Sequence, residues 1–303
     1  MADGVLNLGD GRRIGYSEWG PAGAPPILYC HGFPSNRREL DLLQPVLERC
    51  QVEARLVALN RPGYGPSTFQ ADRTILDWPR DVAEAADILG IGRFAVLGVS
   101  GGAPYALACG YALGDRVTRI GIVVGMGPLD ATGMKHATAI SGPSALGSIR
   151  RLQFGMAALA FRKGQEGRFV DQSVASMGPA DREVMERGEV RAWFIEVMHE
   201  SFQEGGRAAA HEAGLYRSGW GFDPQQVTNE TRFWYGGVDE TVPASAGEWL
   251  AGRIPESEYT LWPQHGHFSW MISDEAAHAV SATARGWFWT GEGGADSSGL
   301  LVG

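Results

Sequence analysis

Residues 98–102 read GVSGG, and this short stretch constrains the fold more than any other part of the sequence. It joins an apolar run, RFAVL at 93–97, directly to a run of small residues, APYALACGYAL at 103–113. A strand can turn straight into a helix only where crowded positions lack side chains, and glycine provides this on both sides of Ser100. Such a turn would project the Ser100 hydroxyl outward and aim the amino end of the helix at it. A Gly-Ser-Gly stretch alone is more often a flexible turn, so the neighbouring segments must show whether this one joins a strand to a helix.

Apolar strands alternate with helical segments on both sides of this turn. Strands are predicted at 25–32, 54–60, 93–100 and 116–125, and again at 231–237 and 257–263. Residues 5–20 add a hairpin around the turn GDG. Strands that are apolar on both faces are typical of a parallel sheet covered by helices. The sequence therefore predicts an α/β fold with a mostly parallel sheet of about eight strands, an N-terminal hairpin and flanking helices.

The alternation stops after the sixth predicted strand. From about Met126 to Ser218 the sequence shows amphipathic helical segments, such as 148–164 and 189–206, and no convincing strand. We predict that residues 127–218 form a helical cap, or lid, inserted into a core made of 1–126 and 219–290. Residues 291–303 are rich in Gly and Ser, which predicts a disordered tail.

Composition restricts the class of partner. The formal net charge of −9 disfavours nucleic acid and anionic membranes, and the basic cluster NRREL at 36–40 is interpreted as a solvated helix start. Cys30, Cys50 and Cys109 lack disulfide or metal-ligand spacing and are interpreted as reduced core residues. With no predicted leader or transmembrane segment, we expect a cytoplasmic monomer or homodimer that acts on a small molecule without cofactor or metal.

A nucleophilic serine needs a histidine base. His267, in PQHGHFSW, follows the last predicted strand in a loop that would return to the edge of the sheet where Ser100 lies. His265 is the reserve candidate. The remaining histidines of the predicted cap and the last helix are interpreted as surface or packing residues.

The histidine in turn needs a carboxylate to hold its tautomer and stabilise its cation. Asp239, in FWYGGVDETVP, follows a strand and a double-glycine turn. Glu240 is adjacent but would point elsewhere, and Asp130 after the preceding strand is an alternative. The order Ser, Asp, His, each after a strand, favours Asp239 over an ordinary turn aspartate.

An oxyanion hole would complete the site. Two backbone N–H donors are needed, and in this arrangement they would belong to Phe33, in CHGFP at 30–34, and to Gly101. Loss of one such donor costs roughly 2–4 kcal/mol of transition-state stabilisation. His31 is interpreted as a hydrogen-bonding buttress for the loop.

Five motifs together resemble the α/β-hydrolase superfamily: HGFP at 31–34, RPGYGPS at 61–67, GVSGG at 98–102, YGGVDETVP at 235–243 and GHF at 266–268. They look nearest to capped esterases, carbon-carbon-bond hydrolases and cofactor-free haloperoxidase-like members. The resemblance implies an acyl-enzyme mechanism in which Ser100 attacks a carbonyl, His267 is the base and Asp239 orients it. Epoxide hydrolases and haloalkane dehalogenases look similar but use an aspartate nucleophile, so Ser100 disfavours those activities. We expect Arg61 to anchor its loop rather than face substrate.

The predicted cap is rich in flexible apolar side chains. Six of the eight methionines lie at or within it, at positions 126, 134, 156, 177, 185 and 198. Methionine adapts to irregular shapes, so these residues indicate a substrate with a hydrophobic portion. Met126, Phe154, Trp193 and Met198 are the candidate substrate-binding residues.

The leading hypothesis is a serine hydrolase of an ester, thioester or lactone with an apolar portion. One alternative is a carbon-carbon-bond hydrolase of a vinylogous diketone acid, for which Arg150, Arg151 and Arg162 would have to bind the substrate carboxylate. Another is a slow-turnover receptor that retains the three catalytic side chains.

Overall fold

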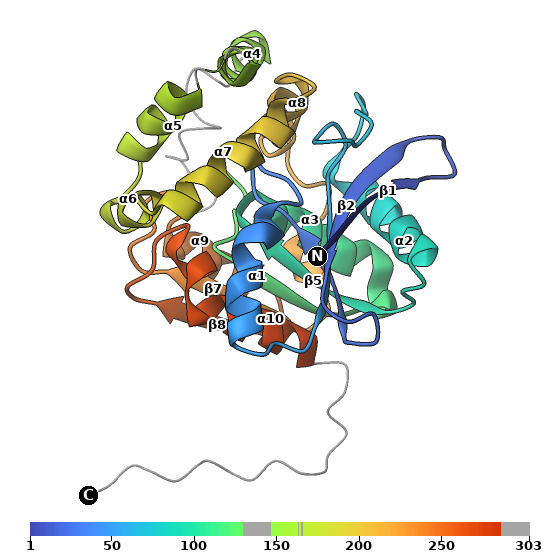
Figure 1. Ribbon diagram of the computed structural model, residues 1–303. Coiled ribbons are helices and arrows are strands. Elements are labelled where there is room, and N and C mark those ends of the chain that lie inside the picture. Colours follow the sequence, from blue (N-terminus) through green and yellow to red (C-terminus); the bar gives the residue numbers. More distant parts are fainter. Residues whose placement is uncertain (130–146, 163, 165, 286–303) are drawn as a thin grey trace, which may run out of the picture.

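A single eight-stranded sheet forms the centre of the molecule in the computed structural model, which describes residues 1–129, 147–162, 164 and 166–285 (Figure 1). The spatial order of its strands is β1-β2-β4-β3-β5-β6-β7-β8. The strands are β1 (Ala2–Asn7), β2 (Arg13–Trp19), β3 (Pro26–Cys30), β4 (Arg55–Leu59), β5 (Phe94–Val99), β6 (Val117–Val123), β7 (Thr231–Gly236) and β8 (Ser257–Trp262).

The direction of the strands follows the predicted pattern. β1 pairs with β2 and β2 with β4 in antiparallel fashion, and the remaining neighbours from β4 to β8 pair in parallel. The hairpin turns at Gly11, whose φ of +84° is readily reached only by glycine. The prediction of a mostly parallel sheet with an N-terminal hairpin is therefore confirmed.

Helices cover both faces of the sheet, as expected for parallel strands. α1 and α10 pack on one face, and α2, α3 and α9 pack on the other (Figure 1). These helices are α1 (Glu39–Arg49), α2 (Trp78–Ile88), α3 (Ala103–Leu113), α9 (Ala244–Ala251) and α10 (Asp274–Ala284).

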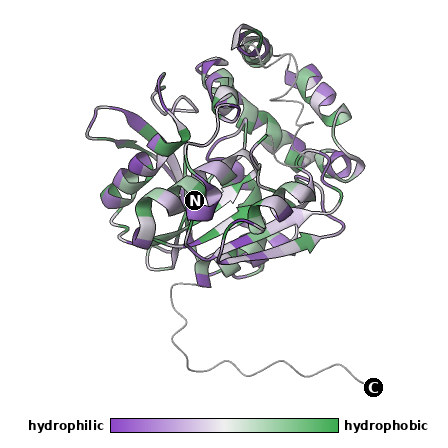
Figure 2. Cartoon of the chain, turned by 180° about the vertical axis from the view of Figure 1, so that it is seen from behind, coloured by the Kyte–Doolittle hydropathy of each residue, from purple (hydrophilic) through white to green (hydrophobic). Residues whose placement is uncertain are grey.

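The middle strand β5 shows how the sheet is stabilised. Its side chains alternate between two hydrophobic clusters, with Ala95, Leu97 and Val99 on the α1 side and Phe94 and Val96 on the other. All of them are buried, and burial of each large apolar side chain contributes roughly 1.5–3 kcal/mol. Figure 2 shows hydrophobic residues along the central strands of the sheet.

The turn from β5 into α3 is as tight as the sequence predicts. A Cβ on Gly98 would lie 2.7 Å from the Cβ of Ala106, and a Cβ on Gly102 would lie 2.0 Å from the carbonyl oxygen of Cys30. Real atoms do not approach so closely, so both positions require glycine. The turn thus brings the start of α3 directly against the end of β3.

Among the described residues between β6 and β7, five α-helices lie together above one edge of the sheet (Figure 1). They are α4 (Gly147–Arg162), α5 (Glu166–Ala175), α6 (Pro179–Met185), α7 (Gly188–Phe202) and α8 (Arg207–Leu215). We call these helices the insertion. The domain limits proposed from the sequence, at 126/127 and 218/219, stay predictions, and the predicted tail at 291–303 lies outside the described residues.

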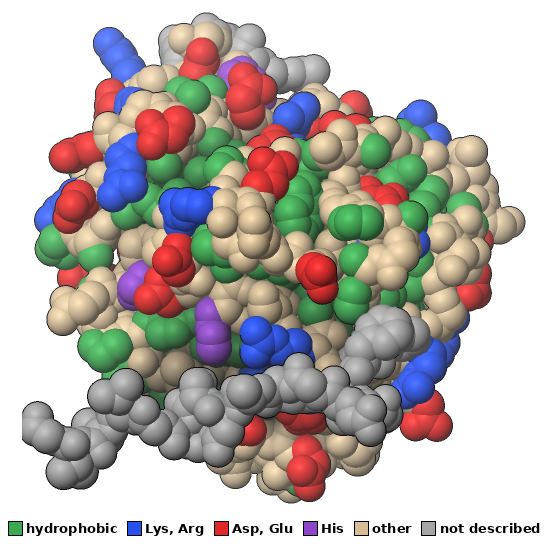
Figure 3. Space-filling model, turned by 60° about the horizontal axis from the view of Figure 1, so that its bottom comes forward, with side chains coloured by type: hydrophobic (Ala, Val, Ile, Leu, Met, Phe, Trp, Pro, Cys, Tyr) green, Lys and Arg blue, Asp and Glu red, His purple; other side chains and the backbone are tan. Residues whose placement is uncertain are grey.

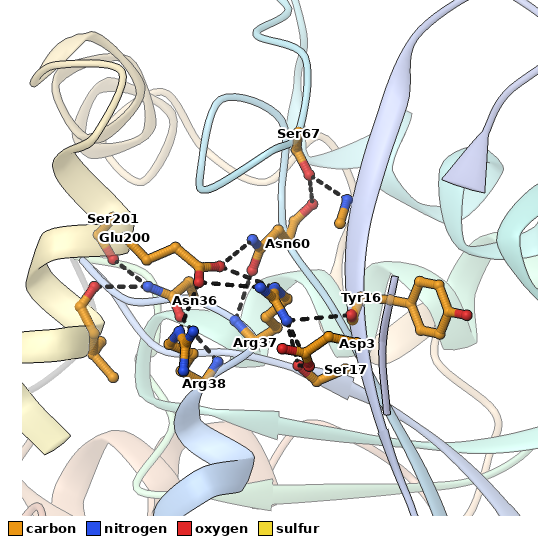
Figure 4. Close-up of polar contacts among 12 residues, drawn as sticks. Asp3, Tyr16, Ser17, Asn36, Arg37, Arg38, Asn60, Ser67, Glu200 and Ser201 are labelled. Carbon is orange, nitrogen blue, oxygen red and sulfur yellow. Dashed lines mark hydrogen bonds and ion pairs between the residues drawn. The ribbon is translucent and has the colours of Figure 1, made fainter. Parts of the chain in front are cut away.

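The insertion is tied to the core by a buried ionic cluster (Figure 4). Glu200, near the end of α7, accepts hydrogen bonds from Nε of Arg37 at 3.0 Å, Nε of Arg38 at 2.8 Å and Nδ2 of Asn60 at 2.9 Å. Arg37 is only 8% exposed. The interpretation of residues 36–40 as a solvated helix start was therefore wrong for Arg37, because a carboxylate from the insertion covers and neutralises it.

The outer surface carries charges of both signs. On the face shown in Figure 3, Lys and Arg side chains are interspersed with Asp and Glu and do not gather into one patch. The three cysteines are free, and Cys30 and Cys109 are buried, but Cys50 is exposed at the end of α1, so its interpretation as a core residue was wrong. None of the helices in the described ranges combines the length and apolarity needed to cross a bilayer.

The glycine at 102 gives a direct test of the strand-to-helix turn. We expect Gly102→Ala to lower the free energy of unfolding by about 1–3 kcal/mol, because the added methyl group forces α3 away from β3. Denaturant unfolding followed by circular dichroism measures this. Gly92→Ala is the matched control, since a Cβ there meets no atom within 4 Å. Equal stability of the two variants would contradict the interpretation.

Candidate active site

Three predicted side chains meet at the edge of the sheet beneath the insertion. Nε2 of His267 lies 2.9 Å from Oγ of Ser100, and Nδ1 of His267 lies 2.8 Å from Oδ2 of Asp239. Ser100 follows β5, Asp239 follows β7 and His267 follows β8. Because these strands are parallel, their carboxyl ends meet at one edge, and loops far apart in the sequence converge there. The distances allow proton transfer from the hydroxyl to the imidazole.

The backbone at Ser100 holds the hydroxyl toward this edge. Its φ is +51°, in the left-handed region that non-glycine residues rarely adopt. Strain of this kind persists only where the surrounding structure enforces it, and it is concentrated at functional sites. The buried β5 strand before Ser100 and the close α3 helix after it supply that enforcement.

Asp239 is fixed independently of the histidine. Its Oδ1 accepts hydrogen bonds from the backbone N–H groups of Thr241 at 2.7 Å and Val242 at 2.8 Å, which leaves Oδ2 for His267. The carboxylate thus has one oxygen held by its own turn and one directed at the imidazole.

The alternatives considered for these roles lie elsewhere. His265 Nε2 contacts Oγ of Ser273 at 3.2 Å and a carboxylate oxygen of Glu275 at 3.3 Å, away from Ser100. Glu240 is exposed. Asp130 lies outside the described residues. The described geometry therefore supports His267 and Asp239.

Burial and charge have opposing effects on His267, which is 6% exposed. Burial alone would lower its pKa, but the charge of Asp239 and its hydrogen bond, together with the charges of Asp181 and Glu39, raise the pKa above its ordinary value. The site is thus built to stabilise a protonated imidazole, which is what a base becomes after it accepts a proton.

The two predicted oxyanion-hole residues lie side by side next to Ser100. A Cβ built on Gly101 would lie 3.3 Å from the backbone nitrogen of Phe33 and 2.5 Å from its Cβ. A Cβ on Gly32 would lie 3.5 Å from Cβ of Ser100. The Phe33–Pro34 peptide bond is cis. The backbone of the 31–34 turn therefore runs directly past the serine.

A buried arginine holds this turn. The Arg61 guanidinium donates hydrogen bonds to the carbonyl oxygens of His31 and Gly32, the latter at 2.7 Å, and its backbone N–H donates to Nε2 of His31 at 3.2 Å. Burial, with the charge of Arg61, keeps the pKa of His31 well below its ordinary value, so the ring is neutral and can accept that bond. Arg61 is thus a loop anchor and His31 a buttress, as expected.

The charge of Arg61 is balanced from the insertion. Glu212 on α8 is fully buried and lies 2.5 Å from Nε of Arg61 and 3.4 Å from Nη2 of Arg73. Burial opposes ionisation of Glu212, but the two arginines lower its pKa to about 2. Just beyond α8, the Tyr216 hydroxyl donates to the carbonyl oxygen of Gly101 at 2.8 Å. Glu212 on α8 therefore neutralises the arginine that holds the 31–34 turn, and the residue after α8 binds the backbone of Gly101.

A cavity of about 260 Å³ opens next to Ser100 and His267. Its lining includes Phe154 on α4 and Trp193 and Met198 on α7, three of the four candidate substrate-binding residues, whose role in binding stays a prediction. Aromatic side chains form much of its wall, namely Phe33, Phe154, Phe169, Trp193, Phe194 and Phe268. The site can therefore bind an apolar group against the reacting atoms.

Met126 is not among the residues that line this cavity, which corrects its assignment as substrate-binding. Its side chain is 5% exposed and belongs to the hydrophobic cluster on the α3 side of the sheet. Its backbone N–H donates to the carbonyl oxygen of Ser100 at 2.9 Å. Met126 thus supports the serine through its backbone, while the side chain packs into the core.

Two carboxylates of the site carried no signal in the sequence. Glu39 lines the cavity, and its oxygens accept hydrogen bonds from Gly32 N–H at 2.9 Å and from the Tyr29 hydroxyl at 2.7 Å. Asp181 accepts from the backbone N–H of His267 at 2.8 Å. Both stand in the first turn of a helix, where acidic residues are common for reasons of the helix dipole alone.

Comparison with known proteins connects this geometry to a family. The family model described as "alpha/beta hydrolase fold" matches residues 25–273. A bifunctional esterase/perhydrolase of Acinetobacter calcoaceticus is 31% identical over 128 residues, 42% of this chain and 46% of the relative. Haloalkane dehalogenase 2 of Mycobacterium tuberculosis is 31% identical over 150 residues, 47% of this chain and 49% of the relative. The chain thus covers about half of each relative's length.

Solved structures resemble nearly the whole chain. A thermophilic esterase from Thermogutta terrifontis has a TM-score of 0.69 at 20% identity, covering 94% of this chain and 98% of that one. The enol-lactonase from Burkholderia xenovorans LB400 has a TM-score of 0.67 at 19% identity, covering 92% and 97%. A bromoperoxidase from Bacillus anthracis has a TM-score of 0.65 at 17% identity, covering 94% and 100%. At these identities the likeness concerns the fold.

The effect of Asp239 on the histidine can be measured directly. We expect His267 in the wild type to keep its proton to a higher pH than an ordinary histidine, and Asp239→Asn to move the titration midpoint to lower pH because the neighbouring charge is removed. Nuclear magnetic resonance of labelled histidine reports the midpoint. Glu240→Gln, which changes an exposed neighbour, is the control. An unchanged midpoint in Asp239→Asn would contradict the pairing.

Proposed function

The chain belongs to the alpha/beta hydrolase fold family, and from that premise we propose that it is a serine hydrolase of a carboxylic ester, thioester or lactone with an apolar portion. The observation that carries the proposal is the hydrogen-bonded series from Oγ of Ser100 through the His267 ring to Oδ2 of Asp239. In this series the nucleophile contacts the base, and the base contacts the carboxylate that orients it.

In the first half of the reaction, Oγ of Ser100 attacks the carbonyl carbon while Nε2 of His267 takes the hydroxyl proton. Asp239 stabilises the resulting imidazolium. The carbonyl oxygen becomes an oxyanion, which accepts hydrogen bonds from the N–H groups of Phe33 and Gly101. The tetrahedral intermediate then collapses, the bond to the leaving oxygen or sulfur breaks, and His267 returns its proton to the leaving group. The product is an acyl ester of Ser100.

In the second half of the reaction, a water molecule takes the place of the leaving group next to His267. The oxygen of the water molecule bonds to the acyl carbon while His267 takes a proton from that water. A second oxyanion forms and accepts hydrogen bonds from the same N–H groups of Phe33 and Gly101. Collapse of this intermediate breaks the bond to Oγ, and His267 gives the proton back to Ser100. The free acid leaves and the enzyme regains its starting state.

The identity of the nucleophile separates this proposal from dehalogenation. Haloalkane dehalogenases of this family resemble the chain but use an aspartate at the nucleophile position, where this chain has Ser100. Attack of a serine hydroxyl on a carbonyl carbon gives an acyl ester, whose carbonyl carbon water can then attack to release Oγ, so a serine nucleophile suits a carbonyl substrate. The similarity to a dehalogenase is therefore taken as a likeness of fold and motif.

The cavity favours a neutral substrate. Glu39 is the acidic residue of the lining, and no Lys or Arg occurs among the described residues that surround the cavity. Burial raises the pKa of Glu39, which its hydrogen bonds oppose. A substrate carboxylate would find no lysine or arginine in this lining, while the aromatic walls suit an apolar acyl or alcohol group.

The absence of lysine and arginine from the described lining disfavours a carbon-carbon-bond hydrolase of a diketone acid. That activity needs a cation for the substrate carboxylate, and Arg150 and Arg151 instead line a different surface pocket together with His211. The side chain of Arg162 is outside the described part of the chain. A receptor with slow turnover uses the same site and is distinguished by the rate of product formation.

Covalent labelling tests the nucleophile. We expect the wild type to take up one equivalent of an aryl phosphonate, and Ser100→Ala to take up none and to lose about 10³-fold or more of kcat/KM on an aryl ester. Intact-mass spectrometry and ester kinetics measure both effects. Ser173→Ala is the matched control, since this serine also lines the cavity but bonds to the carbonyl of Phe169. Absence of labelling in the wild type would refute the proposal.

Substrate charge tests the cavity. Among aryl esters of increasing acyl length we expect kcat/KM to be highest for an acyl chain that still fits the cavity of about 260 Å³. A neutral butyrate should exceed the corresponding hemisuccinate in kcat/KM by about 10-fold or more, because the latter buries an unpaired carboxylate. The same assay with a dienoate substrate should give no carbon-carbon cleavage. Preference for the charged ester or for the dienoate would overturn the assignment of substrate class.

A further inference from the structure

A buried aspartate of the insertion is bonded to the backbone of the histidine loop. Asp181 stands in the first turn of α6 and is 1% exposed. Its Oδ2 accepts from the N–H of His267 at 2.8 Å, and its Oδ1 accepts from the N–H of Phe268 at 2.7 Å. Each carboxylate oxygen therefore accepts a hydrogen bond from one of two consecutive backbone N–H groups, and the first of these belongs to His267, the base of the proposed reaction.

The chain is shaped to let this carboxylate approach. A Cβ on Gly266 would lie 2.5 Å from Oδ1 of Asp181 and 2.7 Å from Oδ2, so any side chain at 266 would displace the carboxylate. A Cβ on Gly178, just before α6, would lie 3.0 Å from Cδ of Glu240. The start of α6 is thus packed against the loop of the histidine and beside the residue that follows Asp239.

The same carboxylate acts on the charge of the imidazole. The charged groups that face His267 are Asp239 from the loop after β7, Asp181 from α6 and Glu39 from α1, and all three favour its protonated form. The charged groups that face Asp181 are His267 and Asp239. Hydrogen bonds to a carboxylate are about twice as strong as bonds between neutral groups, so this contact fixes the loop firmly.

We propose that Asp181 is a positioning residue for His267, supplied by the insertion, which holds the imidazole in line with Ser100 and adds negative charge beside it. This inference rests on the proposed serine-hydrolase function and adds to it a residue outside the three that react. It implies that the insertion does more than enclose substrate. Misplacement of a reacting group by about 1 Å can cost about 10²-fold in rate, so a contact that sets its position has a kinetic effect.

A merely structural tie between α6 and the core makes a different prediction. It would lower thermal stability when broken, but it would leave the titration of His267 and the rate constants of the folded enzyme unchanged. A positioning role changes kcat more than KM, and loss of the charge moves the acid limb of the pH profile to lower pH because the protonated imidazole is less favoured.

The test uses the full chain and a short neutral aryl ester. For Asp181→Asn we expect kcat to fall about 10- to 100-fold with KM changed less than about 3-fold, and the acid inflection of kcat/KM to move to lower pH. The asparagine keeps one acceptor oxygen but presents an NH₂ group to the second N–H. Glu183→Gln, on the exposed side of the same helix, is the matched control and should behave as wild type.

A second variant reaches the contact from the opposite side. Gly266→Ala leaves Asp181 intact but displaces its carboxylate, since the three nearest atoms to the new methyl group all belong to Asp181. We expect the same direction of change in kcat and in the acid inflection. This variant keeps the proposal testable if Asp181→Asn does not fold, and circular dichroism establishes which variants are folded.

The outcomes separate this inference from the function on which it rests. If the wild type takes up no phosphonate, the proposed function fails and the inference fails with it. If the wild type is labelled and any folded variant of the pair Asp181→Asn and Gly266→Ala retains the wild-type kcat or the wild-type inflection, the inference alone is overturned. Reduced kcat with a shifted inflection in every variant of the pair that folds, and wild-type behaviour of Glu183→Gln, supports it.

Discussion

The parallel direction of β5, β7 and β8 is the constraint on which the rest of the structure depends. It places the loops after these strands at one edge, so that Ser100, Asp239 and His267 come within hydrogen-bonding distance. In the sequence, Asp239 stands 139 positions after Ser100, and His267 stands 28 positions after Asp239. Glycines 98 and 102 then allow the chain to reverse into α3 without displacing the serine. The chemistry thus follows from strand direction and from two positions without side chains.

The insertion is attached to the core through buried acids rather than through apolar contacts alone. Glu200 meets Arg37 and Arg38, Glu212 meets Arg61 and Arg73, and Asp181 meets two backbone N–H groups. Each of these carboxylates is compensated by its partners, and for the fully buried pair of Glu212 and Arg61 removal of one partner typically costs about 3–5 kcal/mol. These contacts favour a single docked arrangement of α6, α7 and α8 over the site.

Local signals made the fold and the convergence of Ser100, Asp239 and His267 predictable from sequence. The alternation of strands and helices, the stretch GVSGG and the position of Asp239 and His267 just after strands all depend on residues close in the chain. Arg37, Met126 and Asp181 could not be placed in this way. The burial of Arg37 depends on Glu200, 163 residues away, and the position of Asp181 depends on a loop 86 residues further on. Such contacts are fixed by tertiary packing, and no periodicity or short motif encodes them.

The charges and hydrogen bonds between the insertion and the core limit how far either part could be exchanged without the other. Acceptors lie on the helices and most of their donors lie on the core, so neither half presents a satisfied surface without the other. A chimaera that grafted these helices onto a related scaffold would bring three carboxylates to positions that lack their cations and amides. Changes to the aromatic residues that line the cavity leave these contacts between the insertion and the core intact, because none of those residues is a partner of Glu200, Glu212 or Asp181 through its side chain.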